Sequence, residues 1–528
     1  MALATLALLA QMAIDSSVEN IASACIVYAS SMMVFLYLSW SKALDTQPLS
    51  SFVVLGFCVT TQFGALLVQT IAWTPLVFSL YDPLYTFGIL AFYQAIAVAV
   101  HAAYCYLSSN ETSADGLVRS MLKGICIYRT PSAGSLWLMG CIGLLSFVAS
   151  GGQAGAGGQA SEGVIISKFV QSFHFFAWAP FLIPFFLQQK GDSYCNSQRL
   201  PWTLAFYVLL IALVGIARNA RGVIFVGAVT VALIYLLHFI RSDKRVTSTA
   251  IMRLGVMAML GALLMQPLTD LVNAMTIARN SRNKLTGIEM IGKTIEVLKQ
   301  PALIAAFKAK RAPKFSLAYD ETYIANPMLG RLIETKFHDN ALHFGRGIVT
   351  EEGRARLWQV TEDRFLAVLP SPVLEALDIN IKKADARFSM GDYLVYLSKG
   401  ARLGSYRTGS LLAQGIALWG FVFPFVYALG CLVVFQLLGL WTTRANVGSA
   451  SVAALGMMQI WWLFQHGLVS DSIGNVFDFI VRGFPQMVLE YAMVFAAASF
   501  FSIRKHVSGD GRDTWEVAKY ASAREPFE

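Results

Sequence analysis

The sequence predicts an all-α, polytopic membrane protein with about eleven transmembrane helices and one large, mostly helical loop between them. Of its 528 residues, 56% are hydrophobic and only 14% are charged. Apolar runs of about 18 or more residues recur, and each is long enough to cross about 30 Å of hydrocarbon as a helix. The expected spans are residues 20–40, 51–72, 85–107, 133–150, 164–188, 201–217, 222–240, 251–268, 411–439, 449–467 and 485–502.

These spans divide the chain into four parts. We expect an N-terminal transmembrane bundle over 1–268, a large loop over 269–408, further transmembrane helices over 409–505 and a polar tail over 506–528. The apolar run Ala2–Ile14 is shorter than a crossing requires and lacks the basic start of a signal peptide. It fits either a short extra membrane helix or a helix that lies at the interface.

Lysine and arginine are distributed unevenly between the two sides of the expected bundle. One side carries about fifteen of them in short connections and the tail, and the other carries about three, namely Arg218, Arg221 and Arg482. Because positive charge accumulates on the cytoplasmic side, the first side is expected to be cytoplasmic. The C-terminus then lies in the cytoplasm, and the loop 269–408 lies outside.

The loop 269–408 is basic, with about 21 Lys and Arg residues against about 15 Asp and Glu residues. A basic external loop suits an anionic substrate, although a solvated loop can carry the same charge without any ligand. Helical apolar spacing covers 287–312, with a break at Pro301, and 362–377, with a break at Pro370 and Pro372. We therefore expect a small helical cap and not an independent enzyme domain.

Two arginine-rich segments lie at the external ends of expected spans. Arg218 and Arg221 lie between spans 201–217 and 222–240, and the same Ala-Arg-Asn-x-Arg pattern returns with Arg279 and Arg282. A guanidinium group binds phosphate oxygens through paired, charge-assisted hydrogen bonds and stays ionised without a metal. Two such clusters near one plane fit a diphosphate. The alternative is that these arginines contact lipid head groups.

Motifs for other chemistries are missing or misplaced. Residues 155–160 match the Gly-x-Gly-x-x-Ala pattern of a dinucleotide-binding turn, but they follow a membrane span, so we expect a flexible external loop. No Gly-x-x-x-x-Gly-Lys-Ser/Thr motif occurs, which disfavours ATP-driven transport by this chain alone. No Cys or His residues have the spacing of a zinc site, so we expect no bound metal.

The C-terminal half adds a layout that has a known counterpart. The arginine-rich junction and the long external loop are followed by Gly391-Asp392-Tyr393, Gly415, Gly420 and Phe421-Val422-Phe423-Pro424, which lead into a span. Over roughly Pro201–Phe501, this layout resembles the O-antigen and exopolysaccharide repeat-unit polymerases of the Wzy type, which are related to the O-antigen ligases.

The resemblance implies an enzyme of the bacterial inner membrane that acts on its outer, periplasmic face. Such an enzyme moves a sugar chain from an undecaprenyl diphosphate carrier onto the end sugar of another carrier-linked repeat unit. Its expected partners are undecaprenyl-diphosphate-linked oligosaccharide, membrane lipids and a chain-length-determining co-polymerase. Nucleic acid, a metal, a nucleotide sugar and any other cofactor are not expected.

The same resemblance assigns roles to individual residues. The donor diphosphate, with its developing charge, would be bound by the external arginines Arg218, Arg221, Arg279 and Arg282. The best external candidates for the base that takes the acceptor proton are His338 and Asp339. Further substrate contacts would come from Arg331, Arg402, Arg407 and Arg482. For Arg482, the simplest partner is Asp478, four residues earlier on the same helix.

Three alternatives to a polymerase remain open. An O-antigen ligase would transfer the glycan to a lipid acceptor, and the sequence separates it poorly from a polymerase. A flippase or transporter would carry charged groups deep inside several spans. In this sequence, the ionisable residues Lys168 and Arg253 lie near the ends of expected spans. His174 is the main ionisable residue that lies deeper in a span. A non-catalytic scaffold would have no reason to place arginines in facing external clusters.

Overall fold

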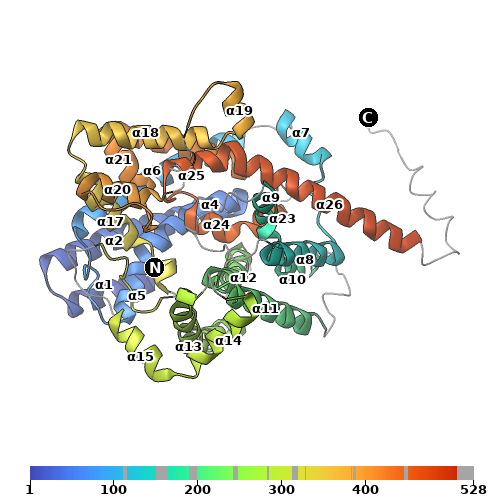
Figure 1. Cartoon of the computed structure of the whole chain (residues 1–528), viewed down its shortest axis with the longest axis horizontal. Coiled ribbons are helices and arrows are strands. Elements are labelled where there is room, and N and C mark those ends of the chain that lie inside the picture. The colour runs from blue at the N-terminus through green and yellow to red at the C-terminus, as the bar shows by residue number, and fades with distance from the viewer. Residues whose placement is uncertain are drawn as a thin grey trace.

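In a computed structural model, the chain is an all-α, polytopic membrane protein (Figure 1). The structure describes residues 1–110, 116–149, 165–188, 199–241, 248–281, 285–311, 319–327, 329–381, 383, 388–444 and 450–507. Within these residues, the strands form one antiparallel hairpin of β1 (Thr442–Arg444) and β2 (Ala450–Val452), in which Thr443 pairs with Ser451. The glycine-rich stretch 155–160 lies outside the described residues, as does most of the expected tail.

Eight helical stretches of the described chain are long and apolar enough to cross a membrane. They are Val18–Trp40, Pro48–Ile71, Pro83–Ser108, Phe169–Phe186, Arg199–Ala217, Arg221–Ile240, Leu411–Gly439 and Ile473–Ser499. Each of them overlaps one of the expected spans. The shorter apolar helices Ala2–Ile14 and Ala133–Ala149 accompany them.

The N-terminal bundle is built around α4 and its continuation. Its elements are α1 (Ala2–Ile14), α2 (Val18–Trp40), α3 (Ala43–Thr46), α4 (Pro48–Cys58), the π turn η1 (Val59–Phe63), α5 (Gly64–Ile71) and α6 (Pro83–Asn110). Helix α2 packs against α4 and α6, and α1 packs against α2 and α5. The buried Asn20 links this bundle to the turn after α5, because its Oδ1 accepts a hydrogen bond from Leu76 N (2.9 Å).

A second set of apolar helices follows α6. It comprises α7 (Leu117–Gly124), α8 (Ala133–Ala149), α9 (Ile165–Ser172), the 3-10 helix η2 (Phe173–Leu182), α10 (Ile183–Gln188), α11 (Arg199–Ala217) and α12 (Arg221–Arg241). Helix α8 packs along η2, and α12 packs against α24 (Ile460–His466). Helix α24, from the C-terminal part of the chain, therefore contacts the helix that begins at Arg221.

The expected loop 269–408 divides between two places in the fold. Its first part continues α13 (Ser248–Ala278) through η4 (Arg279–Ser281) into α14 (Gly287–Leu298) and α15 (Pro301–Lys310), at the bottom of Figure 1. A capping box of Thr286 and Glu289 starts α14, and Pro301 starts α15 at the expected break. Helix α14 packs against α11 and α13.

The second part of this loop gathers at the upper left of Figure 1. It comprises α16 (Leu329–Leu332), α17 (Thr335–Arg346), α18 (Glu351–Ala367), α19 (Ser371–Ala376) and α20 (Met390–Lys399). Helix α17 packs against α6 and α21 (Leu411–Trp419), and α18 packs against α25 (Ile473–Asp478). Both parts of the loop therefore pack against helices of the bundle, and the loop does not form one separate cap.

Residues 449–467, an expected span, do not form one helix. The hairpin is followed by α23 (Ala454–Met458) and α24, which are separated at Gln459. This broken segment runs the length of α22 (Phe423–Gly439), whose N-terminal side is preceded by α21 and η6 (Gly420–Val422). At one end Leu411 N donates to Ser470 O (2.9 Å), and at the other Ala453 N donates to Trp441 O (2.8 Å).

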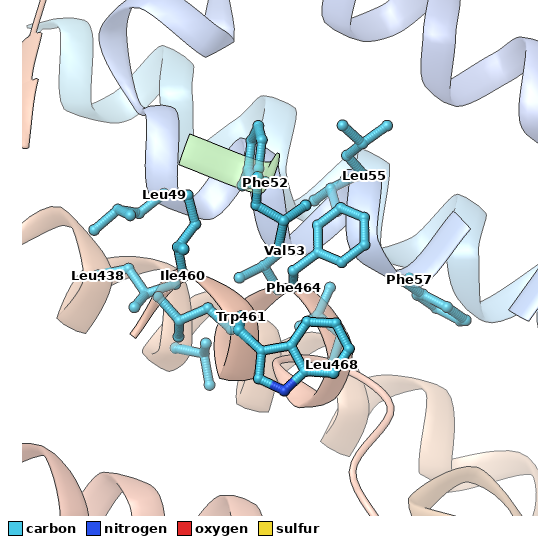
Figure 2. Packing of buried hydrophobic residues seen from close by; sticks show 14 of the residues in the cluster. Leu49, Phe52, Val53, Leu55, Phe57, Leu438, Ile460, Trp461, Phe464 and Leu468 are labelled. Carbon is cyan, nitrogen blue, oxygen red and sulfur yellow. The ribbon is translucent and has the colours of Figure 1, made fainter. Parts of the chain in front are cut away.

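The broken segment is buried against α4. Figure 2 shows side chains of the two segments packed together: Leu49, Phe52, Val53, Ile460, Trp461, Phe464 and Leu468. The closest approach is at Gly56, where a Cβ atom would lie 1.9 Å from Phe464 O. The chain ends with the π turn η7 (Phe479–Gly483) and α26 (Phe484–Val507).

Candidate active site

The turn between α11 and α12 sends its two arginines in different directions. Asn219 adopts a left-handed backbone conformation (φ 50°), which reverses the chain between Arg218 and Arg221. The Arg218 guanidinium donates to Phe147 O at the end of α8 and lies 5.6 Å from the centre of the Phe147 ring. Arg218 therefore contacts the C-terminal end of α8, where its charge stabilises the helix, whereas Arg221 contacts α13.

Arg221 faces α13 and lies among other arginines. Its Nη1 donates to Thr276 Oγ1 (2.8 Å). Arg279, Arg311 and Arg331 lie close enough to repel its charge, and these three side chains are exposed. We call Arg221, Arg279, Arg311 and Arg331 the arginine cluster. Arg282 lies outside the described residues.

The arginine cluster concentrates positive charge from several parts of the described chain. Four chain segments supply it: the start of α12, the end of α13, the end of α15 and α16. Among the described residues, none of the four arginines forms an ion pair with a carboxylate. Because like charges repel one another most strongly in partly desolvated surroundings, an anion bound between them would be stabilised.

The segment after α16 reaches into the bundle at a π turn. The widened turn η1 leaves some of its own carbonyl groups accessible, and Thr60 O accepts a hydrogen bond from Glu334 N (2.8 Å). Thr61 O accepts from Thr335 Oγ1 (2.7 Å). Thr60 lies near the midpoint of the helical stretch Pro48–Ile71. Glu334 therefore lies deep in the fold. A backbone hydrogen bond fixes its position, in addition to side-chain packing.

The Glu334 carboxyl group faces α24. Its Oε1 accepts from Gln465 Nε2 (2.9 Å) and lies 3.6 Å from His466 Nδ1. The pKa of Glu334 is raised to about 8, mainly by burial and in smaller part by Asp471, while Gln465 and Arg331 oppose the shift. Arg331 interacts electrostatically with both Glu334 and Arg221, so it links the arginine cluster to this carboxyl group.

A cavity of about 480 Å³ lies beside His466. Its polar lining comes from α24, from the connection to α25 and from α25 itself: Gln459, His466, Ser470, Asp471, Asn475 and Asp478. The remaining wall is Trp462, Phe479, Gly483 and Met487. The cavity thus combines carboxylates, a histidine and apolar surface, and it borders the second π turn, η7.

His338 and Asp339, the expected base residues, are both committed to packing. His338 is buried, its Nδ1 lies 2.8 Å from Ser410 Oγ at the start of α21, and burial lowers its pKa to about 4. The Asp339 carboxylate accepts from Tyr81 N, from Thr86 Oγ1 and from Lys336 Nζ (2.9 Å). Neither residue lines the cavity beside His466.

The other expected substrate arginines lie elsewhere. Arg407 pairs with Asp392 (3.5 Å) and stacks on Tyr319, so it stabilises the chain before α21. Arg402 is exposed and is not among the electrostatic neighbours of Arg221. Arg482 donates to Gln486 (3.3 Å) and forms no ion pair with Asp478 within the described residues, because the π turn η7 breaks the four-residue stacking.

Four residues of this region were not expected from the sequence. Arg311 follows Lys308 and Lys310 at the end of α15. In the sequence, three cations at a helix end indicate side chains exposed to solvent. Glu334 and His466 are 132 positions apart, and no spacing connects them. Glu490 lies within the expected span 485–502, is 2% exposed and accepts from Gln486 Nε2 (2.8 Å). It is a buried acid inside a span.

No protein-family model, curated protein or solved structure matches this chain.

Proposed function

We propose that this protein is a glycosyltransferase of the bacterial inner membrane that polymerises undecaprenyl-diphosphate-linked oligosaccharide repeat units. The glycan leaves one carrier and joins the end sugar of another, and the product is a surface polysaccharide. An O-antigen ligase, which would use the same donor and a different lipid acceptor, is the nearest alternative. The two share the donor site and differ in the acceptor.

The observation that carries the proposal is the arginine cluster. When the bond between the donor sugar and the diphosphate breaks, the leaving diphosphate gains negative charge. Guanidinium groups that are already fixed around it stabilise this charge more in the transition state than in the ground state. Because arginine is always ionised, such a site works without a metal. Arg221 begins a membrane-crossing helix, so a carrier whose tail stays in the bilayer can present its diphosphate there.

The same proposal includes a topology. We assign the arginine cluster and the segment 319–346 to the periplasmic side and the C-terminal tail to the cytoplasm, from the distribution of Lys and Arg. Counting α8, α13 and the broken segment 450–470 with the eight candidate helices gives eleven crossings. A broken crossing is tolerated where its backbone is buried in protein, as the segment is against α4.

The test uses the purified chain in detergent and lipid-linked repeat unit extracted from host cells that lack this protein. Wild type should give a ladder of longer glycans, and it should do so in EDTA. Arg221→Ala, Arg279→Ala, Arg311→Ala and Arg331→Ala should each lower the rate about 10- to 100-fold, the effect of losing a charge-assisted contact. Retention of wild-type rates in all four variants would contradict the proposal.

Matched controls separate charge loss at the cluster from charge loss in general. Arg356 is exposed on α18 and donates only to Gln359 (2.7 Å), so Arg356→Ala should keep the wild-type rate. Arg331→Lys keeps the charge but loses the planar fork, and it should recover part of the rate. The melting temperature of each variant shows whether a loss of rate comes from unfolding.

A carrier for polyprenyl-linked sugars is the second candidate, and two observations favour it. The segment 450–470 is discontinuous, and the acid Glu490 is buried within α26. Transporters commonly combine such features near the middle of the membrane. The detergent assay distinguishes the two candidates, since a micelle has no second compartment and chain extension there is chemistry and not transport.

A further inference from the structure

We propose that His466 and Glu334 form the acid–base pair that removes the proton from the acceptor hydroxyl, with His466 facing the cavity and Glu334 positioning it from behind. This inference rests on the proposed glycosyl transfer. It replaces His338 and Asp339, which are buried and do not line the cavity, with a pair in which His466 does line it.

The geometry assigns a separate role to each member of the pair. His466 Nδ1 lies toward Glu334 Oε1 (3.6 Å), and the opposite ring nitrogen, Nε2, hydrogen-bonds to no described residue. The His466 side chain is 38% exposed and lines the cavity, whereas that of Glu334 is only 8% exposed. A histidine with a carboxylate close to one ring nitrogen and an open cavity at the other is an arrangement that general bases use.

Glu334 is held firmly enough to orient the ring. Its backbone N–H is bonded to Thr60 O in the π turn η1, and its Oε1 accepts from Gln465, the neighbour of His466 on α24. Gln465 Nε2 also donates to Arg331 O (2.7 Å). One amide group therefore ties the carboxyl group, α24 and the segment that carries Arg331 into a single unit.

The pair lies next to the site proposed for the diphosphate. Arg331 precedes Glu334 by three residues, about one helical turn, and it interacts electrostatically with Glu334 and with Arg221. Helix α12, which begins at Arg221, packs against α24, which ends at His466. A donor diphosphate at the arginine cluster thus has its sugar within reach of a hydroxyl in the cavity, as transfer requires.

The glycosyl transfer forms one bond at C1 of the donor sugar and breaks another. The acceptor oxygen attacks C1 of the donor sugar, and its proton passes to His466 Nε2. The bond between C1 and the phosphate oxygen breaks, and its electron pair leaves with undecaprenyl diphosphate. The positive charge on the imidazole is offset by the Glu334 carboxylate, and the negative charge on the leaving group is offset by the arginine cluster.

The charged groups around the pair set its pH dependence. They come from α16, α24, α25 and the chain before α25: Arg331, His466, Asp471 and Asp478. The base form needs an ionised Glu334 and a neutral His466. Since burial raises the pKa of Glu334 to about 8, the wild-type rate should rise with pH through about 8. In Glu334→Gln that ionisation is lost, so the rise should move from about 8 to lower pH.

The experiment measures chain extension and binding of undecaprenyl diphosphate on the same purified variants. His466→Ala should lower kcat by about 100- to 10,000-fold, the usual contribution of a general base, and should bind undecaprenyl diphosphate within about threefold of wild type. His466→Gln keeps the size of the side chain and should show the same loss if folding is intact. Glu334→Gln should lower kcat less and shift the pH profile as described.

His343 supplies the matched control. It is exposed, belongs to α17 and stacks on Tyr81 (4.2 Å), so His343→Ala should extend chains at the wild-type rate. Wild-type kcat in both His466 variants, or a pH profile of Glu334→Gln that matches wild type, overturns this inference alone. Wild-type protein that extends no lipid-linked unit overturns the proposed function and the inference together.

Discussion

Asp339 and Lys336 form a buried ion pair that fixes the start of α6. The two groups lie 2.9 Å apart, with side chains only 0% and 4% exposed, and Lys336 also lies over the Tyr81 ring. The carboxylate accepts backbone hydrogen bonds from the turn that precedes α6. Removing one partner of such a pair leaves an uncompensated buried charge, which is far more harmful than the loss of an exposed ion pair.

Asp339→Ala should therefore destabilise the protein by about 3–5 kcal/mol, read as a large fall of the melting temperature in detergent. Arg346→Ala is the control, because Arg346 pairs with Asp82 of the same turn but is 55% exposed. Its loss should change stability by less than about 1 kcal/mol. Equal melting temperatures for the two variants would refute the structural role of Asp339.

Sequence reasoning reached two members of the arginine cluster because external arginines next to apolar spans are rare enough to notice. This argument predicts Arg221 and Arg279, whereas Arg331 is predicted only as a further substrate contact from the end of the loop. Arg218 was assigned to the same ligand, but the left-handed turn at Asn219 directs it to α8. The sequence shows which residues lie near a turn, but it does not show in which direction their side chains point.

The pair of Glu334 and His466 could not be predicted from the sequence, since only the folded chain brings it together. His466 falls at the end of an apolar run, where it looks like a polar end of a membrane helix, and Glu334 is one of 15 acids in the loop. The contact depends on the π turn η1, whose extra residue per turn has no signature in apolar periodicity.

At the scale of elements, the segment 450–470 is one of three expected spans, with α8 and α13, that are not among the eight continuous candidates. An apolar run has the same sequence pattern whether its side chains contact lipid or protein. The sequence therefore predicts one membrane helix over 449–467. In the structure its side chains face α4, and the close contact at Gly56 leaves room for no larger residue. Helix class was predictable from the sequence, whereas the break at Gln459 was not.

Gly56→Ala should destabilise the protein, because the new Cβ would overlap a backbone oxygen that cannot rotate away. We expect a loss of about 1–3 kcal/mol or more and a lower rate of chain extension, since α24 carries His466. Gly88→Ala is the matched control, because Gly88 lies in α6 and a Cβ there meets nothing within 4 Å. It should leave the melting temperature unchanged or raise it slightly. An unchanged melting temperature for Gly56→Ala would rule out the tight contact.

At the scale of the whole molecule, two basic connections lie together at one end of the bundle. Arg119 Nη2 donates to Gly439 O (3.2 Å), and Tyr128 donates to Leu440 O. The region of α7 therefore borders the end of α22 and the hairpin that carries Arg444. Both connections belong to the side that the charge count assigns to the cytoplasm.

Thiol labelling of spheroplasts with a membrane-impermeant reagent checks this orientation. Ala355→Cys, exposed on α18, should be labelled above the level of the parent chain, and Ser120→Cys, exposed on α7, should be labelled only after lysis. Both substitutions are small, so neither should disturb folding. The reverse pattern would invert the topology and would place the arginine cluster on the wrong side for a periplasmic enzyme.

The depth at which Glu334 meets the π turn has a consequence for selectivity. An acceptor hydroxyl that reaches this level has left bulk solvent behind, and so has the anomeric carbon that it attacks. Water is the commonest competing nucleophile for an activated glycosyl donor, and its attack would discharge the carrier without lengthening the chain. If the protein transfers glycans as we propose, a reaction beside the buried Glu334 favours transfer over hydrolysis.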